Sequence, residues 1–289
     1  MNPAPSVIIF SVLSGMGFGY LALLATVHDY TGVAAFWHWF VGYFLATVGL
    51  AASTFHLGNP QRAWRAFTQW RSSWLSREAW GAVLALILLA PLALSDWLGL
   101  GMPRAFGWIG ATLCSVTVFA TGMIYAQIRA VPRWHHWSVP VVFLAFAVAG
   151  GCILAGLRIP AVLALLALAV VMVLHWRIGD GAFARAGSSM GSATGLAGIG
   201  AVSVFEQPHT GGNYLMREMI FVVGRKHAQK LRVLALGLGV GAPVVAMLAL
   251  PGSTGPFVAA PLHLLGALAQ RWLFFAEAEH VVGLYYGKR

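Results

Sequence analysis

A histidine and a carboxylate stand at the facing ends of two long apolar runs. His56 closes the run that begins near residue 35, and Glu78 opens the run that follows. A neutral imidazole donates or accepts a hydrogen bond, and a carboxylate takes up a proton. A quinone head group needs partners of both kinds, so the pair suits quinone chemistry. A helix cap at His56 and an ion pair between Glu78 and an arginine form the structural alternative.

The segment between these two residues is basic and aromatic. Its charges would favour the negative charge of a reduced quinone, and its tryptophans would either wall a pocket or anchor the chain at a membrane interface. These residues are Arg62, Arg65, Arg71, Arg77, Trp64, Trp70 and Trp74. From this region we predict that His56, Arg62, Trp74, Arg77 and Glu78 contribute to quinone binding.

A second polar group lies near the C-terminus. Arg271 falls inside an apolar run, and a charge placed there normally faces the interior of a helix bundle with a partner. Glu277 is less than two helical turns away, where pairing along one helix is poor. We therefore expect Arg271 to pair with Glu78 or, failing that, with Glu277. Arg271 and His280 complete the predicted quinone-binding set, and a structural salt bridge between helices is the alternative.

The composition predicts an all-α polytopic membrane protein. Hydrophobic residues make up 59% of the 289 residues and charged residues only 9%, with a mean hydropathy of +0.78. Soluble domains carry about 25% charged residues. The net charge of +10 is then expected to lie in cytoplasmic loops rather than to bind nucleic acid.

Eight apolar stretches approach the length of about 20 residues that spans a bilayer. They cover about 6–27, 35–55, 77–95, 105–126, 138–157, 160–176, 232–250 and 257–284. The first lacks a basic leader and a cleavage site, so we expect a retained helix. The odd-numbered loops contain only Arg104 and Arg158 as basic residues, whereas the even-numbered loops contain many. The positive-inside rule therefore places the even loops and both termini in the cytoplasm.

The stretch 177–231 is the one long connection in a chain that we otherwise expect to form a single integral-membrane domain over 1–289. Within it, residues 214–223 are apolar with one polar pair, which predicts an interfacial or re-entrant helix. The connection is either a flexible linker or a docking surface for a cytoplasmic partner. We favour docking, because the apolar piece would otherwise have nothing to bury it.

The remaining polar residues suggest less chemistry. Cys114 and Cys152 lie in apolar runs without metal-ligand spacing, so we expect both to pack in the core and we predict no metal site. The His-Trp pairs, such as His136-Trp137, fit an aromatic belt at the membrane boundary. No pair of histidines shows a spacing that favours b-type haem. Asp29 and Asp96 are expected to be solvated.

Two motifs resemble the membrane-anchor subunit family of dimethyl sulfoxide reductase. The first is His-Leu-Gly-x-Pro-x-Arg-Ala at 56–63 followed by Leu-Ser-x-Glu at 75–78, and the second is Arg-Trp-Leu-Phe-Phe at 271–275. The chain length and the eight predicted helices are also similar. The sequence of residues 70–78 looks most like that of the family branch found with cytoplasm-facing sulfite dehydrogenases.

The resemblance implies a multi-pass subunit of the bacterial inner membrane. A four-cluster iron–sulfur subunit and a molybdopterin catalytic subunit would dock on its cytoplasmic face, and the chain would exchange electrons with ubiquinone or menaquinone. The quinone-site histidine and glutamate of the family match His56 and Glu78 by motif. The chain itself would hold no site for the partner's substrate. A purely structural anchor and a small-solute transporter are the rival functions, although paired broken helices, the usual sign of a transporter, are not evident.

Overall fold

The computed structural model describes residues 1–206, 211–220, 225 and 227–286, and of His56 it describes only the backbone. All regular secondary structure in these residues is helical. The long helices are α1 (Pro5–Thr26), α2 (Gly32–Ala52), α3 (Trp74–Leu98), α4 (Ala105–Ala126), α5 (Ser138–Leu154), α6 (Arg158–Asp180), α11 (Ala228–Leu236) with α12 (Ala242–Ala249), and α13 (Thr254–Ala276).

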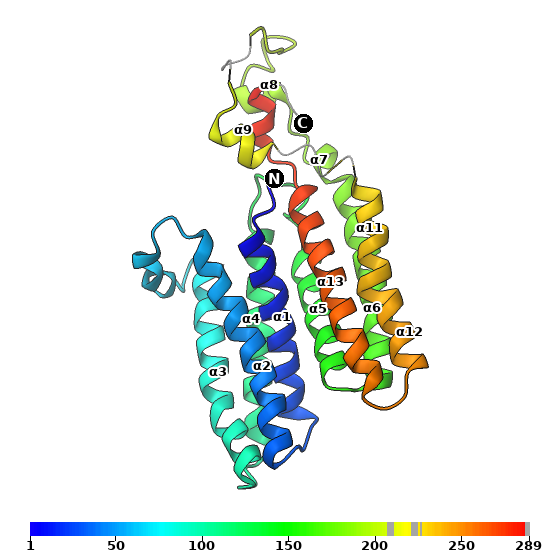
Figure 1. Cartoon of the computed structure of the whole chain (residues 1–289). Coiled ribbons are helices and arrows are strands. Elements are labelled where there is room, and N and C mark those ends of the chain that lie inside the picture. Colours follow the sequence, from blue (N-terminus) through cyan, green and yellow to red (C-terminus); the bar gives the residue numbers. More distant parts are fainter. Residues whose placement is uncertain (207–210, 221–224, 226, 287–289) are drawn as a thin grey trace.

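Within the described residues, seven helical segments are long and apolar enough to cross a membrane, which confirms a polytopic membrane protein. The segment α5, with 17 residues, is shorter. At about 1.5 Å per residue, it spans roughly 26 Å, slightly less than the ~30 Å hydrocarbon core. The eighth crossing therefore remains a prediction, although α5 lies alongside the other helices in the bundle (Figure 1).

Helix α1 is central to the bundle and contacts α2, α4, α5 and α13. Its glycine at position 19 lies against the backbone of Ala147 in α5, where a Cβ atom would collide with the Ala147 carbonyl. Small residues at helix crossings let backbones approach closely, which is how membrane helices gain packing contacts without a hydrophobic driving force.

The predicted seventh span is interrupted in its middle. Residues Gly237–Gly241 (η3) form a π-helical turn between α11 and α12. Pro243 has no N–H to donate to the carbonyl of Gly239 four residues earlier. The imidazole of His263 in α13 donates to that carbonyl instead, at 2.7 Å. The interruption is therefore satisfied by a neighbouring helix, as buried backbone in a membrane requires.

The two ends of the bundle differ in what they carry. The N-terminus, the connection 53–73 and the short helices α7 (Ala182–Arg185), α8 (Met190–Thr194), α9 (Tyr214–Met219) and η4 (Val281–Tyr286) gather at one end, here called the loop end (Figure 1). Short turns close the opposite end. The even-numbered predicted loops thus share one end with the N-terminus and η4, in agreement with the predicted alternation. That the loop end is cytoplasmic remains a prediction.

The long connection differs from expectation. The predicted helix over 214–223 is helical only at Tyr214–Met219, and residues 221–224 lie outside the described residues. This segment is held by polar bonds rather than by apolar burial. Asn213 donates to the hydroxyl of Tyr286 at 2.9 Å, and the backbone N–H of Asn2 donates to Glu218 at 2.8 Å.

The last predicted span, 257–284, also ends early, because α13 stops at Ala276. Beyond it, the N–H of Val281 donates to the carbonyl of Ala130, at 2.9 Å, in the connection between α4 and α5. Contacts with that connection therefore replace the continuing helical bonds.

Candidate functional site

Glu78 is buried at the contact between α3 and α4, one turn into α3 from the loop end. Its side chain is 4% exposed, and the Thr121 hydroxyl of α4 donates to its carboxylate. One turn further along α3, a Cβ atom on Gly81 would lie 2.7 Å from the Thr117 hydroxyl, so the glycine allows the close approach of α4. The observed partner of Glu78 is a hydroxyl, and the alternative of an arginine ion pair is not seen among the described residues.

Arg77 fastens the connection 53–73 to the start of α3. Its guanidinium donates to the carbonyls of Trp70 (3.0 Å) and Arg71 (2.7 Å) and lies 4.3 Å from the centre of the Trp74 ring. Trp80 donates to the carbonyl of Phe67 at 2.9 Å. The basic and aromatic residues predicted to surround a quinone therefore also give this connection a defined shape.

A cleft lies between α3, α4 and the connection 53–73. It has a volume of about 450 Å³ and is lined by Trp70, Arg77, Trp80, Gly81, Leu84, Leu113 and Val116. We call it the α3–α4 cleft. Its volume falls within the range of about 300–1,000 Å³ that small-molecule sites occupy, and such sites are mostly apolar with a few polar groups. Two indole rings and one guanidinium match that description, while the Glu78 carboxylate, next to Arg77 in the chain, is buried behind the lining.

The remaining predicted residues of this region have different positions. The backbone of His56 ends the short helix η1 (Ser53–His56), which contacts α1, α2 and η2 (Pro60–Phe67). The His56 side chain lies outside the described structure, so its approach to Glu78 remains a prediction. Arg62 is exposed on η2, and the half-buried Trp74 packs against Phe119 of α4.

Arg271 is buried as predicted, but its predicted ion pair is wrong. The side chain is 2% exposed, and its guanidinium carbon lies 3.6 Å from the centre of the Phe143 ring. Its Nε and Nη1 atoms have no hydrogen-bond partner among the described residues. Neither Glu78 nor Glu277 pairs with it. Attraction to the π faces of the surrounding rings partly replaces the missing carboxylate.

Glu277 is engaged elsewhere. It binds Arg232 of α11 at 2.6 Å and Arg133 of the α4–α5 connection at 3.3 Å, and Asp180 binds the same two guanidiniums. Burial raises the pKa of Glu277, and Arg133 and Arg232 act against that rise. This four-residue network joins α6, α11 and the end of α13 at the loop end.

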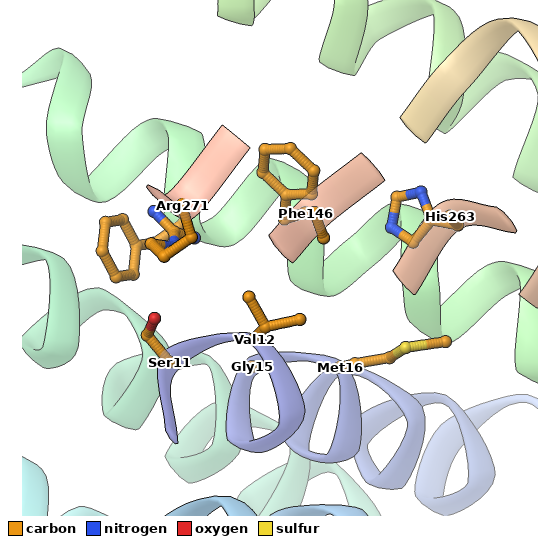
Figure 2. Close-up of a pocket in the computed structure, with 9 residues that line it drawn as sticks. Ser11, Val12, Gly15, Met16, Phe146, His263 and Arg271 are labelled. Atoms are coloured by element: carbon orange, nitrogen blue, oxygen red, sulfur yellow. The ribbon is translucent and has the colours of Figure 1, made fainter. Parts of the chain in front are cut away.

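A small cavity adjoins Arg271 in the middle of the bundle. Figure 2 shows Arg271 and His263 at its two ends, with Ser11, Val12 and Met16 of α1 along its floor. Its volume of about 10 Å³ is close to the smallest that holds one water molecule. It is therefore too small for a quinone ring.

Tyr125 was not singled out in the sequence and lies near both Glu78 and Arg271. It lies one turn beyond Thr121 on α4, and both charges lie close enough to act on its phenol. Its ring packs against Trp134, Phe143, Phe274 and Phe275 at centroid distances of 5.3–5.7 Å. Arg271 lies over the Phe143 and Phe274 rings of this same aromatic cluster, whereas the carboxylate of Glu78 accepts from Thr121. The sequence signal, a spacing of four residues from Thr121 to Tyr125, is too common to find it.

His280 lies away from the α3–α4 cleft. It follows α13 and lines a small pocket with Phe183, Met219 and Arg225 beside α9. Its Nδ1 accepts the backbone N–H of Val282 at 3.0 Å, and burial lowers its pKa. The predicted residues thus divide into three places: the α3–α4 cleft with its connection, the Arg271 cavity and the His280 pocket.

Two further expectations have mixed outcomes. Cys114 and Cys152 are both buried in the apolar core, as predicted. Asp96 was expected to be solvated, and that is wrong: it is buried, and its carboxylate accepts from Trp39 and Arg104, each at 3.0 Å. Asp29 is the exposed partner of the same arginine.

Known proteins are similar in sequence to this chain. The DMSO reductase anchor subunit family matches residues 1–181, which include His56, Arg62, Trp74, Arg77 and Glu78. One of the subunits of the sulfite dehydrogenase of Allochromatium vinosum is 32% identical over 322 aligned positions, covering 99% of each chain. This second similarity therefore also includes Arg271 and His280.

Proposed function

The chain belongs to the DMSO reductase anchor subunit family, and we propose that it exchanges electrons between the membrane quinone pool and an iron–sulfur partner. A bound ubiquinone or menaquinone would supply the two-electron, two-proton chemistry. The observation that carries this proposal is a buried carboxylate, Glu78, beside an aromatic-walled cleft at the loop end. Buried ionisable groups within membrane segments are costly and usually mark functional sites.

The residues in and around the α3–α4 cleft would each have a different role in quinone binding. Trp70 and Trp80 offer ring faces to the head group, and Arg77 holds the connection in place so that these faces stay along the cleft wall. Glu78 would hold or release a proton at its carboxylate, which the Thr121 hydroxyl orients. His56 would supply a hydrogen bond from the other side of the connection. Arg62 would add positive charge near the mouth.

Arg271 and His280 have other roles in this proposal. Arg271 contacts rings rather than the cleft, and His280 lies beside the N-terminal segment. We therefore remove both from the quinone-contacting set.

The loop end would carry the partners, a four-cluster iron–sulfur subunit and a molybdopterin subunit beyond it. The connection 53–73 presents large apolar side chains, with Phe55 85% and Trp64 61% exposed, among arginines. Exposed aromatic residues and arginines are enriched in protein interfaces. A cluster docked there would lie close to the α3–α4 cleft, as electron exchange requires.

Sulfite is the substrate that we propose for the catalytic partner. The similarity to a protein of a sulfite dehydrogenase extends over nearly all of both chains, whereas the family match covers residues 1–181. Sulfite-dependent reduction of a quinone analogue by the purified complex is the expected result. Quinol-dependent reduction of a sulfoxide, without the sulfite reaction, would instead assign a reductase.

Glu78→Gln tests the site itself. The amide keeps a carbonyl for Thr121 but cannot exchange a proton, so quinone-linked turnover should fall at least tenfold while the complex still assembles. Turnover of the catalytic subunit with a soluble electron acceptor should be unchanged. Asp29→Asn, at an exposed carboxylate on the opposite end of the bundle, is the matched control.

Unaltered quinone turnover in the Glu78→Gln complex would leave a purely structural anchor as the function. Sulfite flux into liposomes that contain the chain alone would support the transporter instead.

A further inference from the structure

A second cleft lies on the flank of α4 and α5, and the proposed quinone site does not use it. Its volume is about 500 Å³, and we call it the α4–α5 cleft. It is lined by Phe119, Met123, Ala126, His135, His136, Trp137, Pro140 and Val141. These residues come from the last turns of α4, the first turn of α5 and the connection between them.

The position of this cleft suits a ligand that enters from the bilayer. Its walls belong to membrane helices and are partly exposed, with Phe119 37% and Trp137 67% exposed. Both helices reach the loop end here, so the connection 127–137 closes the cleft at the expected membrane boundary (Figure 1). An apolar tail would remain in the lipid while a polar ring reached the connection.

Two imidazoles line the cleft with opposite hydrogen-bonding roles. The Nδ1 atom of His135 lies 2.8 Å from the carbonyl of Ala126, which only accepts, so Nδ1 carries the proton and Nε2 is an acceptor. In His136, Nδ1 accepts the backbone N–H of Ser138 at 3.1 Å, so the neutral ring carries its proton on Nε2. The cleft therefore offers one acceptor and one donor.

Buried residues fix the orientation of His136. The Ser138 hydroxyl lies 3.0 Å from Nδ1 of His136 and 2.9 Å from Nδ1 of His175, which is 3% exposed. The Ser138 N–H and hydroxyl thus both face the unprotonated Nδ1 of His136, and the hydroxyl bridges to His175. The chain of bonds sets the tautomer of His136, as partners behind a functional histidine commonly do.

The lining distinguishes between possible membrane ligands. It contains no lysine or arginine, the side chains that bind a lipid phosphate. A quinol ring instead offers two neutral hydroxyls at opposite edges, so one can donate to the Nε2 acceptor of His135 while the other accepts from the Nε2 donor of His136. The carbonyl oxygens of the oxidised quinone only accept, so the quinone would bind the His136 donor alone. Aromatic walls at Phe119 and Trp137 match its flat faces.

We propose that the α4–α5 cleft binds the head group of a membrane quinone, as a second site beside the α3–α4 cleft. This inference rests on the proposed function. The ring of Phe119 in the wall of the α4–α5 cleft also meets that of Trp74 in α3, with a centroid distance of 5.9 Å. Ser138 and His175 are positioning residues, since they act on the ligand only through His136.

Photolabelling with an azido-quinone analogue tests the second site in the purified complex, reconstituted in lipid nanodiscs. Peptide mapping should find label in 119–141 as well as in 70–84, and excess unmodified quinone should displace both. His136→Leu should reduce the label in 119–141 at least fivefold while sparing 70–84. Ser138→Ala should weaken that label, and Ser138→Thr should restore it. Ser115→Ala, on the outer half of α4, is the control.

Three outcomes would overturn the inference. Displaceable label in 70–84 alone would remove the second site and leave the proposed function standing. Label in 119–141 that phospholipid displaces but quinone does not would assign the cleft to lipid. The absence of displaceable label from both peptides would overturn the proposed function together with the second site.

Discussion

Arg271 is a buried cation whose observed neighbours are aromatic rings. A charged side chain at a helix centre costs at least about 2.5–3.5 kcal/mol on insertion scales, and stacking on an aromatic face returns about 2 kcal/mol when desolvated. The rings of Phe143, Phe146 and Phe274 therefore offset much of this cost, in place of the ion pair that the sequence suggested.

Arg271→Met should leave the melting temperature of the complex unchanged or raised, because methionine fills the same space without a charge. Arg271→Lys should be less stable than Arg271→Met, since it keeps the charge but loses the planar stack on Phe143. Thermal denaturation in detergent measures the order. A fall of more than about 3 °C in Arg271→Met would show that the guanidinium has a favourable partner, since ~1 kcal/mol moves the melting temperature by roughly 2–4 °C in chains of 150–250 residues.

His280 should make the fold sensitive to acid. Burial lowers its pKa in the folded chain below the unfolded value of about 6.5. The unfolded state then binds more protons between the two values, so stability is fully present above pH ~6.5 and is lost as the pH falls towards the folded pKa. His280→Gln removes this pH-dependent contribution to the stability. When the pH is lowered from 7.5 to 5.5, the melting temperature of the wild type should fall further than that of the variant. Equal decreases would contradict the assignment of this acid sensitivity to His280.

At the residue scale, the burial of a side chain within one segment was predictable. Its contacts with side chains that are distant in the sequence were not. The burial of Glu78 and of Arg271 follows from an ionisable residue inside an apolar run. Their partners depend on other helices, since Glu78 accepts from Thr121 of α4 and Arg271 lies over Phe143 of α5. The burial of Asp96 likewise depends on Trp39 and Arg104 from other helices.

At the scale of helices, apolar length predicted where each segment lies, and hydrogen bonds between segments decided how it ends. The expected span 105–126 coincides with α4, and the expected start of α5 at 138 is correct. The interruption at Gly237–Gly241 was not predicted, because it depends on His263 satisfying the carbonyl that Pro243 leaves free. The early end of α13 depends similarly on the connection 127–137.

Gly266 of α13 tests the crossing with the interrupted helix. A Cβ atom there would collide with the backbone nitrogen and Cα of Gly239, and neither backbone can move aside without breaking the His263 bond. Gly266→Val should therefore lower the yield of folded protein and the melting temperature by several degrees. Gly237→Val, which meets nothing within 4 Å, should be close to wild type. Equal effects of the two substitutions would contradict the proposed close contact at this crossing.

At the scale of the whole molecule, the distribution of basic residues predicts sidedness. Arg104 and Arg158 are the basic residues near the short turns at the opposite end, and Arg104 is already paired with Asp29 and Asp96. The loop end carries most of the remaining arginines and lysines. The positive-inside rule then places the loop end in the cytoplasm.

Single cysteines introduced at two exposed positions would test that topology in intact cells, in a background without Cys114 and Cys152. Leu100→Cys, 69% exposed at the opposite end, should react with a membrane-impermeant maleimide from outside. Trp64→Cys in the connection 53–73 should react only after the cells are opened. The reverse pattern would move the α3–α4 cleft and its partner surface to the outer face.

The central claim is that electrons pass between quinone and the partner's clusters at the α3–α4 cleft, beside Glu78. Rapid mixing of the oxidised complex with a short-chain quinol, followed by cluster absorbance and freeze-quenched electron paramagnetic resonance, tests it most directly. We expect cluster reduction in the wild type, and reduction at least tenfold slower in Glu78→Gln, while reduction of the same clusters through the catalytic subunit stays unchanged. Equal rates in wild type and Glu78→Gln, or in a complex that lacks this chain, would contradict the claim.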